Sequence, residues 1–407
     1  MDTKYMFAKP ELLAPAGDLE CLEVALRFGA DAVYVGGPMM QLRASSAGMT
    51  LEEVAKGVEL CHAKGKKLYV TVNCFAKDST LEQLPAYGKT LYEMGVDGVI
   101  VSDLGAVSVL RTAVPDLPVH ISTQANCQNA AAAMVYYAMG VRRVVLARET
   151  SLEEIAKMKK LLPLDMELEA FVHGAMCMAY SGRCFISSML TGRSGNQGEC
   201  TQPCRWGYHL TEQKRPGEFF PVEEHENGTN ILSSRDLCCL SLIDDLKRAG
   251  VASFKIEGRM KTPYYVATVV RAYRNKIDGT MPDDILMEEL EAVSHRPYST
   301  GFYEGDMFRY KPDDHLPYVT TCSFAGTVLE VEEGRVLIQQ RSKFSLGDKL
   351  EVVSPKVFGY AFRVESITDE EGNPQDSANH AMQKVWVNCH LPVEVGDLVR
   401  TRAYEKE

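Results

Sequence analysis

Short apolar runs alternate with amphipathic stretches over about the first 280 residues. Eight runs have the length of buried strands: residues 12–16, 32–36, 67–73, 98–103, 119–123, 143–148, 168–173 and 253–257. Between them, apolar residues recur at the i, i+3, i+4 spacing of a helix, and the stretches commonly end in glycine. Eight βα units in series predict a closed (βα)8 barrel. An open, doubly wound sheet is the alternative, because periodicity alone does not show closure.

One interval breaks this rhythm. About eighty residues separate the seventh run from the eighth, and they include a polar, glycine-rich stretch and a predicted helix at 237–250. An insertion that follows a barrel strand lies on the C-terminal face, where barrel enzymes carry their active sites. We therefore expect a TIM-like barrel over residues 1–280, whose insertion, at about 175–240, follows strand 7 and lies at the active-site mouth.

After residue 280 the pattern changes to short alternating strands. A connecting segment at 281–320 leads to residues 321–407, where Gly-Asp pairs stand immediately before two of the expected strands. This pattern predicts a small antiparallel β-barrel domain. Such a domain can hold nucleic acid, or it can act only as a stabilising cap. Its fourteen acidic and ten basic residues weaken the case for RNA binding by this domain alone.

Cysteines are concentrated in the insertion. Four of them follow the spacing C-x6-C-x15-C-x3-C from Cys177 to Cys204, and Cys238 comes later. The start of the chain does not have the order of a signal peptide, so twelve cysteines indicate a reducing, cytoplasmic location. The spacing matches neither a zinc finger nor a ferredoxin, and it favours a [4Fe–4S] cluster over zinc. Buried structural thiols are the alternative, and they account for Cys21, Cys61, Cys74 and Cys127.

Net charge and hydropathy indicate whether the protein is expected to bind membranes or nucleic acid. No apolar run is long enough to span a membrane, so we expect no membrane association. A net charge of −11 argues against an extended nucleic-acid coat. Residues 174–215 and 253–276 are nevertheless locally basic. Aromatic residues accompany these basic stretches and could stack an unpaired base or pack as a lid: Trp206 and Tyr208 beside Arg205, and Tyr264 and Tyr265 beside Lys261.

Polar residues at the ends of the expected barrel strands are the candidate site residues. The candidates for catalysis are His173, Arg148 and Glu257. The candidates for substrate binding are Arg43, Asn73, Gln124, Arg259 and Lys261. Several cations around one opening suit an anionic substrate. The alternatives are buried ion pairs, Arg148–Glu149 or Lys255–Glu257, and a core position for His173.

Hydrolase motifs are weak in this chain. The only His-Glu pair, His225–Glu226, is followed by no second histidine, and no G-x-S-x-G elbow occurs. A Cys177–His173 dyad can be drawn, but no third residue stands out to orient it. A cysteine protease also needs one activated thiolate rather than four or five thiols in one segment.

Several segments resemble the U32 peptidase family. They are ELLAPAGDLECLEVALRFGADAVYVGG, LRASSAGMT, HISTQANCQN, VHGAMCMAYSGRCFISS, NQGECTQPCRW, SSRDLCCL, SFKIEGRMKTPYYVATVVRAYR and HRPYSTGFYEG. The resemblance covers nearly the whole chain, and within the family it is strongest to the prephenate-dependent tRNA uridine hydroxylation proteins. SSRDLCCL resembles the longer of two paired forms, which implies a paralogous U32-family subunit as a partner.

The resemblance implies a cytoplasmic tRNA-modification enzyme that forms 5-hydroxyuridine at the wobble position, with prephenate as co-substrate. It also implies a [4Fe–4S] cluster with Cys177, Cys184 and Cys200 as ligands. For the fourth ligand we favour Cys238, which fits relatives with a distant cysteine, over Cys204, which fits those with C-x3-C; Cys239 is a third choice. The functional alternatives are a collagenase-like U32 peptidase and a non-catalytic RNA-binding scaffold.

Overall fold

The structure is a computed structural model that describes residues 9–42, 48–177, 179–206, 235–305 and 318–402. Contacts divide the chain into two compact units. The first comprises Met1–Leu22, Ala30–Met260 and Arg296–Pro317, and the second comprises Glu23–Gly29, Lys261–His295 and Tyr318–Glu407. Arg43 lies outside the described residues.

The first unit contains a closed parallel barrel. Its strands are β1 (Glu11–Pro15), β2 (Ala32–Gly36), β3 (Lys67–Val72), β4 (Gly98–Val101), β5 (Val119–Ile121), β6 (Arg143–Val145), β7 (Glu167–Ala175) and β9 (Val251–Ile256). Each strand pairs in parallel with the next, and β9 pairs with both β7 and β1, which closes the ring. The predicted eight-stranded barrel is therefore confirmed, and the open-sheet alternative is excluded.

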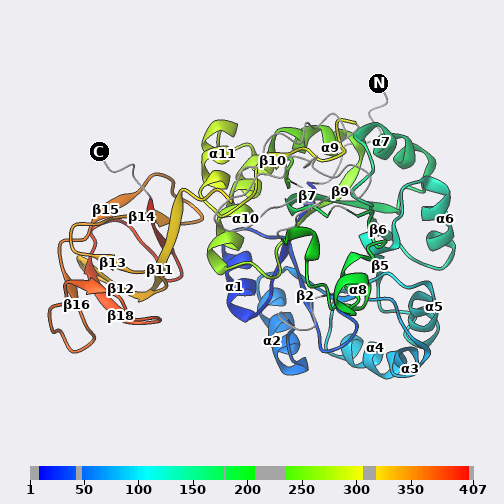
Figure 1. Ribbon diagram of the computed structural model, residues 1–407, viewed down its shortest axis with the longest axis horizontal. Helices are drawn as coiled ribbons and strands as arrows, with labels where there is room; N and C mark the ends of the chain where they lie inside the picture. Colours follow the sequence, from blue (N-terminus) through cyan, green and yellow to red (C-terminus); the bar gives the residue numbers. More distant parts are fainter. Residues whose placement is uncertain (1–8, 43–47, 178, 207–234, 306–317, 403–407) are drawn as a thin grey trace, which may run out of the picture. The chain divides into compact units, whose positions relative to one another are not determined.

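Helices cover the outside of this barrel, as Figure 1 shows for α2 and for α4 to α7. The helices of this part are α2 (Leu51–His62), α3 (Asp78–Leu81), α4 (Leu84–Glu93), α5 (Leu104–Ala113), α6 (Ala130–Ala138), α7 (Leu152–Leu161), α8 (Ile186–Thr191) and α9 (Ile243–Ala249). Helix α1 (Leu19–Arg27) begins in this unit, and its residues from Glu23 onward belong to the second unit. Capping boxes at Thr50 and Ser151 start α2 and α7. Because helices and barrel interior cover both faces of the strands, the strands are nearly continuous apolar runs.

The helix predicted at 237–250 is wrong in its first half. Residues Asp236–Cys238 form strand β8, which pairs antiparallel with the end of β7, and α9 begins only at Ile243. Tertiary pairing overrides the local helical pattern here, since β7 extends beyond β6 and offers free hydrogen-bonding groups. The short strand β10 (Tyr298–Ser299) then pairs with β8.

The second unit joins two helices to the C-terminal strands. Helix α10 (Pro263–Asp278) and helix α11 (Asp283–Glu291) belong to it, although the sequence pattern assigned residues up to 280 to the barrel domain. A buried ion network accounts for this grouping: Glu289 of α11 accepts hydrogen bonds from Arg271 of α10 and from Arg400 of the last strand. Both guanidinium groups are buried.

The C-terminal strands form an antiparallel sheet, as predicted. They are β11 (Cys322–Glu332), β12 (Arg335–Gln340), β13 (Phe344–Ser345), β14 (Lys349–Val353), β15 (Ala361–Arg363), β16 (Ile367–Thr368), β17 (Ser377–Ala378), β18 (Lys384–Asn388) and β19 (Leu398–Arg402). Seven of them pair in the order β15-β14-β19-β11-β12-β18-β16, and β13 pairs with β17. Pairings among the described residues do not join β15 to β16, so they leave the expected barrel unclosed.

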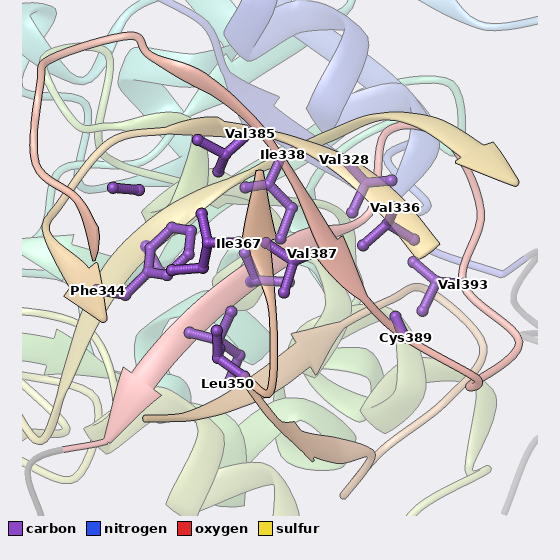
Figure 2. Close-up of a cluster of buried hydrophobic side chains, with 14 of the residues drawn as sticks. Val328, Val336, Ile338, Phe344, Leu350, Ile367, Val385, Val387, Cys389 and Val393 are labelled. Carbon is purple, nitrogen blue, oxygen red and sulfur yellow. The ribbon is translucent and has the colours of Figure 1, made fainter. Parts of the chain in front are cut away.

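The sheet encloses a core of its own. Figure 2 shows Ile338, Phe344, Leu350, Ile367 and Val387 gathered between the strands, and all of them are buried. These residues come from five strands, so burying them holds the sheet together independently of the first unit. In neither unit is any described helix long and apolar enough to cross a membrane.

Candidate functional site

The cysteine-rich segment lies on the C-terminal face of the barrel, as predicted. Gly182 is so close to the loop after β5 that a Cβ atom there would lie 1.9 Å from the carbonyl oxygen of Gln124. A Cβ at Gly198 would lie 2.5 Å from the carbonyl oxygen of Gln41, which follows β2. Both glycines have positive φ, so a side chain would be strained as well as crowded. The Phe75 amide, after β3, donates to the Asn196 carbonyl.

A carboxylate latch fixes the segment between its first two cysteines. Glu149, which follows β6, accepts hydrogen bonds from the amide of Ser181 at 2.8 Å and from its hydroxyl at 2.9 Å. The Arg148 amide donates to the same hydroxyl. A carboxylate acceptor strengthens such bonds. This contact was not predicted from the sequence, where Glu149 stands beside Arg148 and suggests only an ion pair with it.

Four thiol groups of the segment lie close enough together for three of them to affect the pKa of the fourth, Cys204. Burial raises the pKa of the Cys204 thiol, the Arg205 guanidinium lowers it, and the charges of Cys177, Cys200 and Cys184 raise it further. The Cys177 side chain is exposed, and the other three are partly exposed. Four cysteines near one another are the donor set that an iron–sulfur cluster takes. The residues thus fit such a group in type and neighbourhood.

The thiols do not, however, form a ready metal centre. Within the described ranges, no group of three or more His, Cys, Asp and Glu side chains is arranged to hold a metal ion. One feature already suits a metal-bound thiolate: the Gln202 amide lies 3.4 Å from Cys200 Sγ and donates to it, as amides do around iron–sulfur clusters. Binding a cluster therefore requires the thiols to close around it.

The favoured fourth ligand, Cys238, occupies a different setting. It lies on β8, buried, directly opposite His173 of β7. The adjacent Cys239 is fully buried, and burial followed by the charge of Cys238 raises its pKa well above the usual value, which disfavours Cys239 as a thiolate ligand. Cys204 is the cysteine whose pKa reflects Cys177, Cys184 and Cys200. The choice between Cys204 and Cys238 stays a prediction.

The three candidates for catalysis come together at the ends of β6, β7 and β9. Arg148 donates from Nη1 to the carbonyl of Ala175 at 2.7 Å, and its Nη2 lies 3.2 Å from Glu257 Oε2. Its guanidinium carbon lies 4.3 Å from the centre of the Phe171 ring. The Glu257 amide donates to the carbonyl of His173. The ion pair of Arg148 is therefore with Glu257 and not with Glu149.

The burial of His173 restricts its role. Only 1 % of the residue is exposed, and its ring centre lies 5.3 Å from that of Tyr298. Beside it, Glu257 retains 25 % exposure of its side chain and Arg148 retains 12 %. Among the described residues, Arg148 Nε has no hydrogen-bond acceptor. Of the three candidates for catalysis, Arg148 and Glu257 are therefore the residues whose side chains a ligand can reach.

The candidates for substrate binding are divided between the two units. Arg259 belongs to the first unit: it is buried and donates to Gln41 Oε1 at 2.8 Å. Asn73 has a buried side-chain oxygen that finds no donor in the described part of the chain. Gln124 forms the short turn after β5 that supports Gly182. Lys261 belongs to the second unit, where its ammonium group contacts the Ser294 carbonyl and the Tyr265 ring.

Two of the aromatic residues proposed to stack a base are unsuitable. Tyr264 and Tyr265 are each only 5 % exposed, because α10 is buried around its whole circumference from Pro263 to Tyr273. Trp206 is 43 % exposed and is available, whereas Tyr208 lies outside the described residues. Helical periodicity should have indicated the burial of the two tyrosines, since α10 is apolar around much of its circumference.

A buried charge network fills the barrel interior below this site. Glu169 of β7 is fully buried and accepts from Lys255 Nζ at 2.8 Å and from Arg143 Nη1 at 3.3 Å. Arg143 also pairs with Glu11. Burial, followed by the charges of Arg143 and Lys255, lowers the pKa of His120 well below its usual value. The partner of Lys255 is therefore Glu169 and not Glu257.

Comparison with known proteins agrees with this architecture. The profile of peptidase family U32 matches residues 17–311, and that of the peptidase family U32 C-terminal domain matches residues 320–400. The tRNA hydroxylation protein P1 of Bacillus subtilis is 41 % identical over 96 % of this chain and 94 % of its own length. The tRNA hydroxylation protein P of Escherichia coli is 35 % identical over 98 % of both chains. The 23S rRNA 5-hydroxycytidine C2501 synthase of Escherichia coli is 38 % identical over 67 % of this chain and 40 % of its own.

Proposed function

This chain belongs to peptidase family U32, and from that premise we propose that it is a tRNA-modification enzyme. The proposed reaction is the prephenate-dependent hydroxylation of the wobble uridine to 5-hydroxyuridine, with a [4Fe–4S] cluster as cofactor. Relatives that match nearly the whole chain are named as tRNA hydroxylation proteins, and a further relative is named as an rRNA hydroxycytidine synthase. These names support RNA hydroxylation as the class of activity.

The observation that carries the proposal is the position of the thiols. A set of neighbouring cysteines belongs to the segment that packs over the C-terminal end of a parallel barrel, and a partly exposed arginine–glutamate pair lies at the same end. Hydroxylation replaces a C–H bond of the base with a C–O bond. A cluster bound by these cysteines would supply redox chemistry at this face. The ligands that we propose are Cys177, Cys184 and Cys200, together with Cys238 or Cys204.

The residues of the chain bind and orient the other reactants in this proposal. The Arg148 guanidinium group, whose side chain is 12 % exposed, could bind a carboxylate of prephenate or an RNA phosphate. Glu257 holds that guanidinium in place and is itself partly exposed. The base must leave its stack to reach these groups.

A reaction with purified protein tests this proposal against the peptidase alternative. Anaerobically purified protein, with its iron content measured, is incubated with unmodified tRNA and prephenate, and in parallel with a gelatin substrate. We expect 5-hydroxyuridine in the digested tRNA, its loss when prephenate is omitted, and no peptide cleavage. Cleavage of the gelatin, with the tRNA unchanged, would instead support the peptidase function that the family name describes.

A further inference from the structure

Large apolar side chains are exposed in unusual number on the cysteine-rich segment. Within residues 180–206 the exposed fractions are 62 % for Tyr180, 66 % for Phe185, 74 % for Met189, 54 % for Leu190 and 43 % for Trp206. Exposed apolar residues elsewhere in the described chain are scattered, as on most protein surfaces. Gathered exposure of this kind marks an interaction surface. We call these five residues the aromatic face.

Local structure brings three members of the aromatic face, Phe185, Met189 and Trp206, near one another. Phe185 is the N-cap residue of α8, and the amide of Met189 in that helix donates to its carbonyl, so the two residues lie one turn apart on the same side. The short turn Pro203–Arg205 packs against α8, and Trp206 follows it directly. A hydroxyl contact of 3.1 Å between Ser187 and Thr201 holds the two strips of chain together.

The charge of this segment is opposite to that of the chain. Residues 176–206 contain three arginines, Arg183, Arg193 and Arg205, against one acid, Glu199, whereas the whole chain has a net charge of −11. Arg183 and Arg193 are exposed. A polyanion is repelled by most of the protein and attracted here, so the charge directs it to this segment.

We infer that the aromatic face binds unpaired nucleotides of the RNA substrate, by stacking of bases on Phe185 and Trp206 with the arginines on the phosphates. This inference rests on the proposed function and adds the place where the RNA docks. Aromatic rings interleaved with arginines are the means by which proteins hold single-stranded RNA. The face belongs to the segment that carries the cysteines, so a base bound there is close to them along the chain.

The chain contains only two tryptophans, Trp206 and Trp386, which allows a direct test. In the Trp386→Phe variant, Trp206 is the sole tryptophan, and a base stacked on it quenches its fluorescence. In the Trp206→Phe variant, the tryptophan fluorescence comes only from Trp386 of β18. The probes are an RNA hairpin with an unpaired uridine-rich loop and a blunt RNA duplex of equal length. We expect the hairpin to quench Trp206 and to leave Trp386 unchanged, and the duplex to quench neither.

Binding affinities measured by fluorescence anisotropy complete the test. Phe185→Ala and Trp206→Ala should each weaken hairpin binding about tenfold, the loss expected for one stacked base. Arg183→Ala should lower the salt dependence of binding. Tyr92→Ala removes an equally exposed aromatic ring from α4, which is 45 % exposed, and should leave binding unchanged.

Two results would overturn this inference. If the hairpin binds and the tRNA is hydroxylated, but Trp206 is not quenched and the variants bind normally, RNA docks elsewhere and the proposed function stands. If Phe185→Ala instead abolishes self-association of the chain in sedimentation, the face is a protein interface. Absence of 5-hydroxyuridine in every assay contradicts the proposed function itself, and fluorescence then shows independently whether the face binds RNA.

Discussion

Replacing Cys177 or Cys184 with alanine is expected to remove the iron from the protein. Wild-type protein purified without oxygen should be brown, and its iron content should fall by more than about tenfold in either variant, because each loses one thiolate ligand of the cluster. Iron and sulfide analysis together with visible absorbance measures this loss. Cys61→Ala, which removes a fully buried thiol from α2, is the control and should retain the iron.

The same measurement identifies the fourth ligand. If Cys238 is the ligand, Cys238→Ala loses the cluster and Cys204→Ala retains it; the opposite pattern assigns Cys204, whose pKa reflects the three other thiols. Stoichiometric zinc without iron in the wild-type protein would contradict the iron–sulfur assignment altogether.

Replacing Glu169 with alanine should cause the largest loss of stability in the barrel. This carboxylate is fully buried and is shared by Lys255 and Arg143. Burial lowers the pKa of Arg143, but the surrounding groups Glu11, Glu169, Tyr69 and Glu167 raise it, and the net shift is upward, so the guanidinium group stays charged. Without Glu169, one buried ammonium group loses its carboxylate, and the free energy of unfolding should fall by about 3–5 kcal/mol.

Urea unfolding followed by far-ultraviolet circular dichroism measures this change. The control is Glu153→Ala, which breaks an exposed ion pair with Lys157 on α7 and should cost less than about 1 kcal/mol. Equal unfolding midpoints for the two variants would show that the interior network contributes no more than a surface pair.

The barrel was predictable because its signal is repeated eight times. Each strand is a short apolar run, and amphipathic helices separate most of these runs, so local preference and tertiary structure agree. Strand β8 was not predictable, since residues 237 and 238 begin a helical pattern and become part of a strand only where the end of β7 offers a partner. The sequence pattern also did not indicate that α10 and α11 group with the C-terminal strands, because the Glu289 network joins residues that are distant in sequence.

The position of the site on the barrel could be predicted from the sequence, but the ion-pair partners of its residues could not. Strand ends and the long insertion indicated the C-terminal face, where the structure brings Arg148, Glu257 and His173 together. Sequence neighbours suggested ion pairs of Arg148 with Glu149 and of Lys255 with Glu257. The actual partners lie on other strands: Arg148 pairs with Glu257, which follows β9, and Lys255 pairs with Glu169 of β7, because side chains of different strands converge inside a barrel and at its mouth.

Nucleoside mass spectrometry of cellular tRNA tests directly whether this protein is needed to hydroxylate wobble uridines. tRNA is taken from a strain that lacks this gene and any paralogue and that is complemented with wild type, Cys177→Ala, Arg148→Ala or the Cys61→Ala control. We expect 5-hydroxyuridine and its derivatives to disappear in the deletion strain. They should return with wild type and Cys61→Ala, but not with Cys177→Ala or Arg148→Ala. Wobble uridines that are fully hydroxylated without the gene, or with Cys177→Ala, would contradict this expectation.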